Sequence, residues 1–181
     1  MRRHNQIDPY GDDHQIPGYR SATFTGNRDY GDSWIICDMD PKWRKEDHKY
    51  ERLFFLDEAT ALAAGFRPCN RCRRKSLEHF RGQWMEAIDS DHRTAQIDRQ
   101  LRQEGTVRKA GLPADLPVGA MVRFDGEFYL IVADGMRLWS FDGYGPRLDL
   151  PNRRVEIVTP ESTIATIKAG YEPQLHPSAS A

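Results

Sequence analysis

The three cysteines of this chain constrain its fold more than any other feature. Two of them form the motif Cys69-Asn70-Arg71-Cys72, and the third, Cys37, stands alone upstream. In a reducing compartment such a pair indicates either a metal knuckle or a redox pair of the thioredoxin type. A redox pair lies between a strand and a helix, whereas here a short alanine-rich helix is expected before Cys69. This order favours a metal-binding pair over a redox pair.

Composition narrows the class of protein further. An odd number of cysteines argues against a disulfide-bonded scaffold. The residues after Met1 are polar, as in a chain without a secretory signal, and no apolar run reaches the roughly 20 residues that a membrane span needs. We therefore expect a cytoplasmic protein with reduced thiols and no membrane contact. With 26 basic and 27 acidic side chains, any contact with nucleic acid must be local.

The first part of the chain is expected to be an irregular arm followed by short strands. Proline, glycine and charged residues dominate 1–20, which predicts irregular structure. The β-type composition of 21–36 predicts one or two strands that end at Cys37, and 52–56 is expected to be another strand. Asp57 then has the character of a helix N-cap, and the helix should run over 58–64 and end before Gly65.

The middle of the chain is expected to be helical. Leu77, Phe80, Trp84 and Ile88 recur at helical spacing, which predicts an amphipathic helix from Ser76 onward. A second helix should follow a cap at Asp91 and end near Gly105.

The last part of the chain predicts an antiparallel sheet and a terminal helix. Apolar and β-branched runs alternate with Asp-Gly dipeptides, which favour two-residue hairpin turns. The expected strands are 121–124, 127–133, 136–141 and 154–158. The glycine-rich stretch Gly143–Arg147 is expected to be a loop. Thr159 should cap a helix with Pro160 at its first position, and Gly170 should end it.

These elements indicate an α+β fold. We divide the chain into an irregular arm (1–20), a zinc-binding module (21–80), a helical bridge (81–112) and an antiparallel sheet region with a terminal helix (113–181).

The expected metal is Zn²⁺, because structural zinc sites take four ligands and prefer cysteine and histidine. Cys69 and Cys72 supply two of the ligands, and Cys37, at the end of a strand, is the natural third. No fourth cysteine exists, so the remaining ligand must be a carboxylate, a histidine or water. The nearby candidates are Asp38, Asp40, His48 and His79.

The stretch from Asp57 to Cys72 resembles the N-terminal metal-binding domain of the Ada family. That family has an "EA…A-G-[FY]-R-P-C-x-x-C" stretch after an aromatic strand, which matches Glu58-Ala59 through Gly65-Phe66-Arg67-Pro68 and the cysteine pair here. The resemblance implies a zinc site of four ligands and a zinc-bound thiolate that accepts a methyl group from a methylated DNA phosphate. By its interval from the knuckle, Cys37 matches the methyl-accepting position.

The upstream half of the resemblance is partial. The resemblance covers about residues 24–75, and the family's second upstream ligand falls four residues after its first, where this chain has Pro41. Because the family's ligand is followed by proline, Asp40 is the best replacement, and His48 is the alternative. Related zinc modules are appended to other proteins, nucleases included, so the motif alone does not imply methyl repair.

Cationic side chains cluster around the knuckle. Between Arg67 and Arg81 the chain has six cationic side chains and one carboxylate. Guanidinium groups bind phosphate through bidentate hydrogen bonds, so the cluster is suited to contact with a DNA backbone. The candidate phosphate contacts are Arg67, Arg71, Arg73 and Arg74, of which Arg67 and Arg71 correspond to cationic residues of the Ada family. The alternative is a solvated helix face.

Three functions remain open from the sequence. The first is a DNA-associated zinc protein, with Cys37 as a stoichiometric methyl acceptor. The second is a structural zinc site in a protein that binds a protein partner or a ligand through its C-terminal sheet. The third is a redox protein that uses Cys69 and Cys72. No motif for catalytic turnover is present in the sequence.

Overall fold

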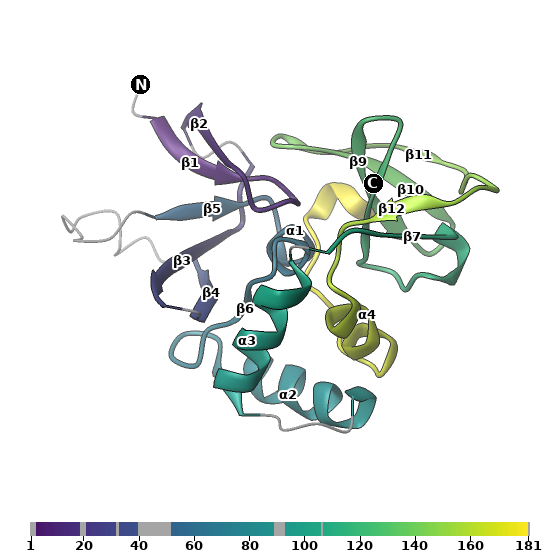
Figure 1. Cartoon of the computed structure of the whole chain (residues 1–181). Coiled ribbons are helices and arrows are strands. Elements are labelled where there is room, and N and C mark those ends of the chain that lie inside the picture. Colours follow the sequence, from purple (N-terminus) through teal and green to yellow (C-terminus); the bar gives the residue numbers. More distant parts are fainter. Residues whose placement is uncertain are drawn as a thin grey trace.

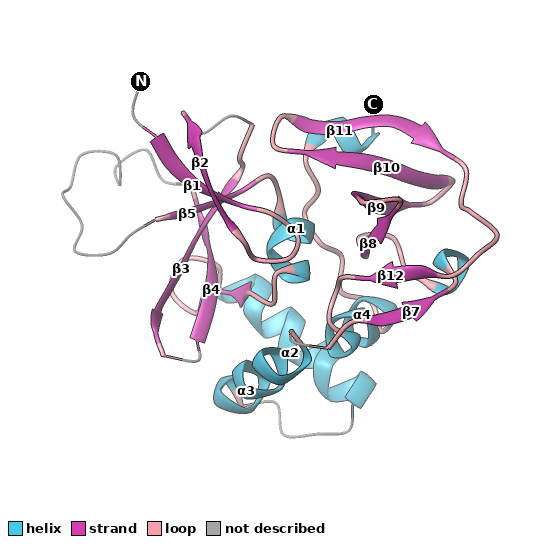
Figure 2. Cartoon of the chain, turned by 45° about the horizontal axis from the view of Figure 1, so that its top comes forward, coloured by secondary structure: helices cyan, strands magenta, loops and turns pink. Residues whose placement is uncertain are grey.

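The structure is a computed structural model, and its fold is α+β, as expected (Figure 1). Two six-stranded sheets lie on opposite sides of a short helix, and the longer helices gather below them (Figures 1 and 2). None of the described helices has the length and apolar character that a membrane crossing requires. The structure describes residues 3–18, 21–31, 33–39, 52–88, 93–105 and 107–180.

The first sheet is mixed and has the order β2-β1-β5-β3-β4-β6. The β1–β5 and β4–β6 pairs are parallel and the other pairs are antiparallel. The parallel β4–β6 pair matters most for the site, because it sets the knuckle beside the end of β4. The strands are β1 (Arg3–Ile7), β2 (Asp13–Pro17), β3 (Phe24–Tyr30), β4 (Ser33–Asp38), β5 (Leu53–Phe55) and β6 (Arg67–Pro68).

The prediction of an irregular arm over residues 1–20 is wrong. This segment contains β1 and β2, which form a hairpin, and β1 also pairs with β5. Ile7 at the end of β1 is fully buried in the core. The strand composition of β1 is poor, and its partner β5 lies far along the chain, so local pattern did not reveal it.

The helices follow most of their sequence signals. The predicted cap Asp91 lies outside the described residues, and Arg93 occupies the N-cap of the helix that ends before Gly105. They are α1 (Glu58–Ala63), α2 (Arg74–Ile88), α3 (Thr94–Glu104) and α4 (Glu161–Lys168). Asp57 caps α1 as expected, because its side chain accepts from the amide of Thr60 at 2.9 Å. Gly65 follows the helix with φ +83°, a conformation that glycine adopts freely. Leu77, Phe80 and Trp84 of α2 are buried on one face.

The second sheet is wholly antiparallel and has the order β11-β10-β9-β8-β12-β7. Its β8–β9–β10 meander confirms the prediction, and the first turn places Asp125 and Gly126 at φ +50° and +90°. The strands are β7 (Lys109–Gly111), β8 (Met121–Phe124), β9 (Glu127–Val132), β10 (Gly135–Ser140), β11 (Gly143–Leu148) and β12 (Val155–Ile157).

Two local predictions in this half are corrected. The expected loop Gly143–Arg147 is strand β11, which tolerates Pro146 because it lies at the edge of the sheet. Thr159 does not cap α4. Its hydroxyl accepts from the backbone amide of Met121 at 2.8 Å, and Pro160 occupies the cap position instead. Thr159 therefore links α4 to β8.

The cores join distant parts of the chain. Ile7 and Phe55 of the first sheet share a cluster with Trp84 of α2 and with Tyr171, which follows α4. A second cluster joins Leu56 and α1 to the aromatic side of the second sheet. Residues of the module expected over 21–80 therefore share their cluster with helix α2 and with the C-terminal segment.

Candidate metal centre

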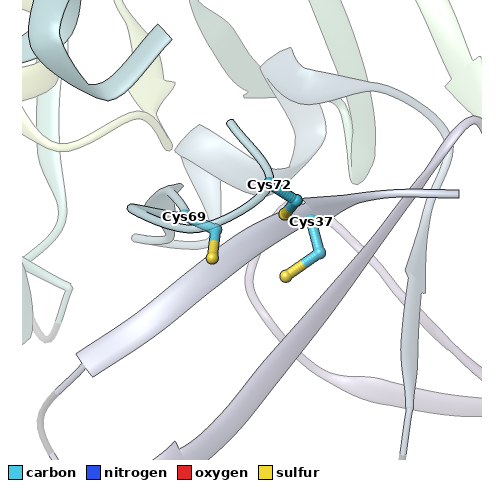
Figure 3. Close-up of side chains that lie close together, drawn as sticks. All are labelled: Cys37, Cys69 and Cys72. Atoms are coloured by element: carbon cyan, nitrogen blue, oxygen red, sulfur yellow. The ribbon is translucent and has the colours of Figure 1, made fainter. Parts of the chain in front are cut away.

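The three cysteine sulfurs converge on one point. Cys37 projects from β4, and Cys69 and Cys72 come from the turn between β6 and α2 (Figure 3). All three sulfurs lie within 4.8 Å of one another. The structure thus brings together the three ligands that the sequence predicts, and they can hold a metal ion.

Backbone hydrogen bonds shape the knuckle around Cys69. The amide of Cys69 donates to the carbonyl of Ile36 at 2.9 Å, which fixes the turn beside β4. The amide of Arg71 donates to the Cys69 sulfur at 3.3 Å, and the amide of Asp38 donates to the Cys72 sulfur. Amides that point at sulfur stabilise thiolate, so the turn is built for ionised cysteines.

The three thiols form hydrogen bonds with one another, and a bound cation can take the place of the protons in them. Hydrogen bonds from Cys37 and then Cys72 lower the pKa of the Cys69 thiol, and the backbone amides of Cys72 and Arg71 lower it further. The pKa of Cys37 is raised, because its thiol donates to Cys69 and Cys72 and is partly buried. A divalent metal would displace the remaining protons and neutralise the concentrated negative charge.

The donor set suits a soft or borderline cation in tetrahedral geometry. Zn–S bonds of about 2.3 Å place tetrahedral sulfurs about 3.8 Å apart, which the observed cluster reaches with a small contraction. Cys69 is buried, Cys37 is half-buried and Cys72 is exposed. Solvent therefore reaches the cluster from the Cys72 side.

Within the described ranges, no fourth ligand joins the cluster. The favoured candidate Asp40 and the alternative His48 lie outside the described residues. The side chain of Asp38 pairs instead with Arg73, at 3.3 Å from Nε to Oδ1. His79 lies on α2 with its ring 5.4 Å from that of Tyr171.

The structure divides the four candidate phosphate-binding arginines into two pairs. Arg67 is buried and forms a two-pronged ion pair with Asp98, at 2.8 and 2.9 Å. Arg73 is buried as well and faces the carboxylate of Glu58 at 2.8 Å. The prediction that these two guanidinium groups contact phosphate is corrected, because carboxylates inside the fold already occupy them. Arg71 and Arg74 are exposed.

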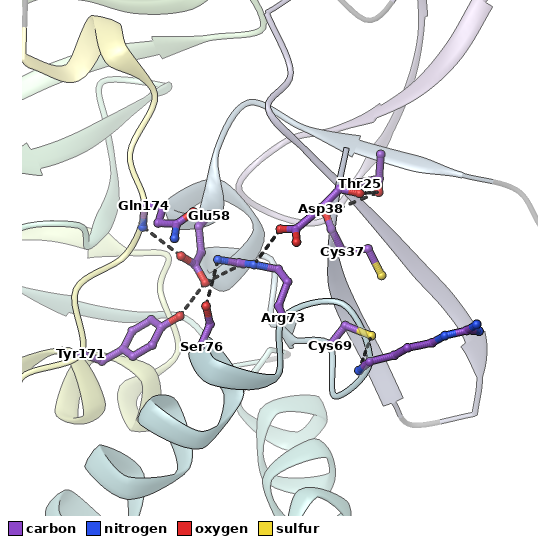
Figure 4. Close-up of polar contacts among 10 residues, drawn as sticks. Thr25, Cys37, Asp38, Glu58, Cys69, Arg73, Ser76, Tyr171 and Gln174 are labelled. Atoms are coloured by element: carbon purple, nitrogen blue, oxygen red, sulfur yellow. Dashed lines mark hydrogen bonds and ion pairs between the residues drawn. The ribbon is translucent and has the colours of Figure 1, made fainter. Parts of the chain in front are cut away.

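A buried polar network lies behind the knuckle (Figure 4). Glu58, with no exposed surface, accepts from Arg73, from the hydroxyl of Tyr171 at 2.6 Å and from the amide of Gln174 at 2.9 Å. Arg73 also lies over the ring of Phe24, 4.4 Å from its centroid. Sequence reasoning missed this network. The one local indication of this network in the sequence is Glu58, a carboxylate at the start of a helix that is otherwise rich in alanine and buried.

Comparison with known proteins identifies no relative of this chain. No protein-family model matches the chain, and no curated protein and no solved structure matches it. The Ada resemblance therefore remains a prediction carried by the residues of the knuckle, and function must be argued from the site itself.

The pairing of Arg73 with Glu58 yields a prediction about stability. Arg73→Met should lower the free energy of unfolding by about 3–5 kcal/mol, because it leaves a buried carboxylate without its cation. Urea denaturation of the full chain measures this loss. The matched control is Arg74→Met, whose partner Glu78 is exposed and whose loss should stay below about 1 kcal/mol. Equal losses in the two variants would contradict the assignment.

Proposed function

We propose that Cys37, Cys69 and Cys72 bind one Zn²⁺ ion in a DNA-associated protein of the Ada type, whose exposed knuckle contacts backbone phosphate. The observation that carries the proposal is the convergence of three sulfurs within 4.8 Å at a turn that solvent reaches. The third sulfur separates this site from a redox pair, which needs only two.

Zinc is the metal favoured by the chemistry of the donors. Thiolates select soft or borderline ions, and a reduced compartment supplies zinc as the common partner of cysteine sites. We assign the fourth ligand to Asp40, with His48 as the alternative. With three thiolates and Asp40 the site would carry a formal charge of −2, equal to that of four thiolates, so its sulfurs would remain nucleophilic.

Two exposed arginines support contact with phosphate. Arg71 lies inside the knuckle, between the two ligating cysteines, and Arg74 begins α2 immediately after it. Phosphate contacts of this kind position a protein on a nucleic acid without reading its sequence. Since the chain has near-zero net charge, the contact is confined to this turn and the start of α2.

Methyl transfer to Cys37 is the activity that the Ada resemblance implies. The thiolate of Cys37 would attack the methyl carbon of a methylated phosphate. A carbon–sulfur bond would form as the carbon–oxygen bond breaks, and the phosphate would leave with the electron pair as an ordinary anionic diester. Bound zinc would keep the sulfur deprotonated at neutral pH. The half-buried position of Cys37 beside exposed Cys72 leaves one approach open.

A structural metal site is the second candidate, and the burial of Cys69 favours it. The sulfur of Cys69 lies under the turn, and its amide bonds to Ile36 of β4. A metal there would join β4 to the start of α2 without any reaction. Function would then lie in the binding of a protein or ligand elsewhere.

Metal content tests the first step of the proposal. The purified full chain should contain one zinc per molecule by elemental analysis, and Cys37→Ser, Cys69→Ser and Cys72→Ser should each lower metal affinity by at least about tenfold, because each removes one thiolate ligand. The matched control is Asn70→Ser, an exposed knuckle position without a sulfur, which should keep its zinc. Unchanged zinc affinity after loss of any one cysteine would contradict the three-sulfur site.

DNA affinity tests the phosphate contact. Arg71→Ala should weaken binding to duplexes of different sequence by a similar factor and lower the slope of log affinity against log salt by about one. Fluorescence anisotropy at several salt concentrations measures both. Arg153→Ala, which removes an exposed arginine from the segment between β11 and β12, is the control and should leave both unchanged. Equal effects of the two variants would place the DNA contact elsewhere.

Mass spectrometry separates the reactive site from the structural one. After incubation of the zinc-loaded chain with DNA that carries methylated phosphates, the peptide with Cys37 should gain the mass of one methyl group. Unmethylated DNA and the Cys37→Ser variant should show no gain. Zinc-loaded protein that binds the DNA but leaves Cys37 unmodified would reject the methyl-acceptor role and favour the structural site.

A further inference from the structure

Asp38 is the residue beside the sulfur cluster whose contacts the proposed function leaves unexplained. It ends β4 and directly follows the candidate ligand Cys37. Successive side chains of a strand point to opposite faces, so the Asp38 carboxylate and the Cys37 sulfur leave β4 in opposite directions. Figure 4 shows this division, with the carboxylate directed toward Arg73 and away from the sulfurs. Asp38 therefore lies next to the cluster without being one of its members.

The carboxylate of Asp38 is held by a buried cation. Its Oδ1 atom lies 3.3 Å from Nε of Arg73. The Arg73 side chain is 2% exposed, and its Nη1 atom also contacts Glu58 at 2.8 Å, so the guanidinium is fixed from two sides. The Asp38 side chain is 56% exposed. Because one partner is already held in place, this ion pair costs less side-chain entropy than a pair between two exposed side chains.

The backbone of Asp38 is held from the neighbouring strand. The hydroxyl of Thr25 on β3 lies 3.4 Å from the carbonyl oxygen of Cys37 and 3.3 Å from that of Asp38, and it donates to both. The antiparallel register of β3 and β4, which pairs Thr25 with Cys37, places the hydroxyl there. The peptide group between Cys37 and Asp38 is therefore fixed on the β3 side as well as on the Arg73 side.

The amide of this fixed peptide group reaches the knuckle. It donates to Sγ of Cys72, the exposed sulfur-bearing residue of the cluster. Such a hydrogen bond favours the thiolate and orients it, as groups behind metal ligands generally do. Arg73 is the next residue after Cys72, so Asp38 contacts two consecutive residues of the turn, one through its amide and one through its carboxylate.

We propose that Asp38 is a positioning residue of the metal centre. Arg73 holds its carboxylate, and the amide of Asp38 thereby keeps the Cys72 sulfur directed at Cys37 and Cys69. This inference rests on the proposed metal binding and extends it to residues outside the ligand set and outside the cysteine motif. Without the ion pair, the exposed end of the knuckle separates from the end of β4 more often, and a bound ion is released faster.

The rate of zinc release tests this role. The zinc content of the purified full chain is measured first, and release from the loaded chain into an excess of a coloured chelator is then followed by absorbance. Asp38→Ala should release zinc at least about tenfold faster than the parent, because loss of a group that orients a ligand typically weakens a metal site by at least that factor.

Two further carboxylate variants separate position from charge. Asp38→Asn removes the charge but keeps an oxygen that accepts from Nε of Arg73, so it should release zinc less than about threefold faster than the parent. The matched control is Glu78→Ala. The carboxylate of Glu78 is 57% exposed and pairs with Arg74, the neighbour of Arg73, and its loss should leave the rate unchanged.

Arg73→Lys tests the same contact from the other side. Lysine keeps a cation opposite Glu58 but lacks the planar guanidinium that contacts both carboxylates. The variant should release zinc about as fast as Asp38→Ala. The double variant should be no faster than either single one, because both substitutions remove the same contact.

The hydrogen bond from the amide can be observed directly. In the isotopically labelled chain loaded with an NMR-active isotope of cadmium, which binds thiolates as zinc does, the amide proton of Asp38 should show a scalar coupling to the metal through the Cys72 sulfur. The coupling should persist in Asp38→Asn and Glu78→Ala and should be lost or weakened in Asp38→Ala. A role in stability alone would not change this signal.

Three results would overturn the positioning role while leaving metal binding intact. They are an unchanged release rate in zinc-loaded Asp38→Ala, equal rates for Asp38→Ala and Asp38→Asn, which would assign the effect to charge, and no coupling at the Asp38 amide of the parent. A parent chain that holds no metal would instead reject the proposed function, and this inference with it. The initial metal analysis distinguishes that failure from the other three.

Discussion

Two consecutive buried carboxylates at the start of α1 hold the molecule together. Asp57 caps the helix and also accepts from the hydroxyl of Tyr144 at 2.8 Å and from the amide of His176 at 3.1 Å. Glu58 accepts from Arg73, from Tyr171 and from Gln174. Both carboxylates are fully buried, and an ion without partners is costly in a protein interior. The second sheet and the C-terminal segment therefore cannot leave α1 without exposing these two carboxyl groups or removing their hydrogen-bond partners.

The same network supports the turn that carries Cys69 and Cys72. Arg73 follows Cys72 directly, and its guanidinium joins Glu58 on one side and Asp38, next to Cys37, on the other. Burial, followed by the charge of Glu58, raises the pKa of Tyr171, and burial likewise raises that of Tyr144, so both phenols stay protonated and donate to the carboxylates. The backbone that presents the sulfurs is thus tied to the C-terminal half of the chain, although the sequence motif of the knuckle ends before α2.

Local sequence signals correctly predicted those features of the fold that depend on residues close together in the chain. The cap at Asp57, the helical spacing of Leu77, Phe80 and Trp84, and the Asp-Gly turn after β8 are each set by neighbours in sequence. The convergence of Cys37 with the knuckle was predicted because ligand chemistry restricts which residues can meet. The partners of Arg67 and Arg73 were not, since Asp98 and Glu58 come beside them only through tertiary packing. Strand β1 was not predicted for the same reason. Its pairing with β5 supplies the stability that its own composition lacks.

The three sulfurs of the candidate metal centre differ in their surroundings, so the two roles proposed for it, structural and reactive, are compatible. Cys69 is 8% exposed and its backbone is bonded to β4, so its contribution is to fix the turn. Cys72 is exposed, and Cys37 is half-buried at the end of a strand. A ligand that anchors needs burial, while a thiolate that attacks a methyl carbon needs an open path. The cluster offers both conditions on different residues, so under the proposed function stability and methyl acceptance need not change together when one cysteine is replaced.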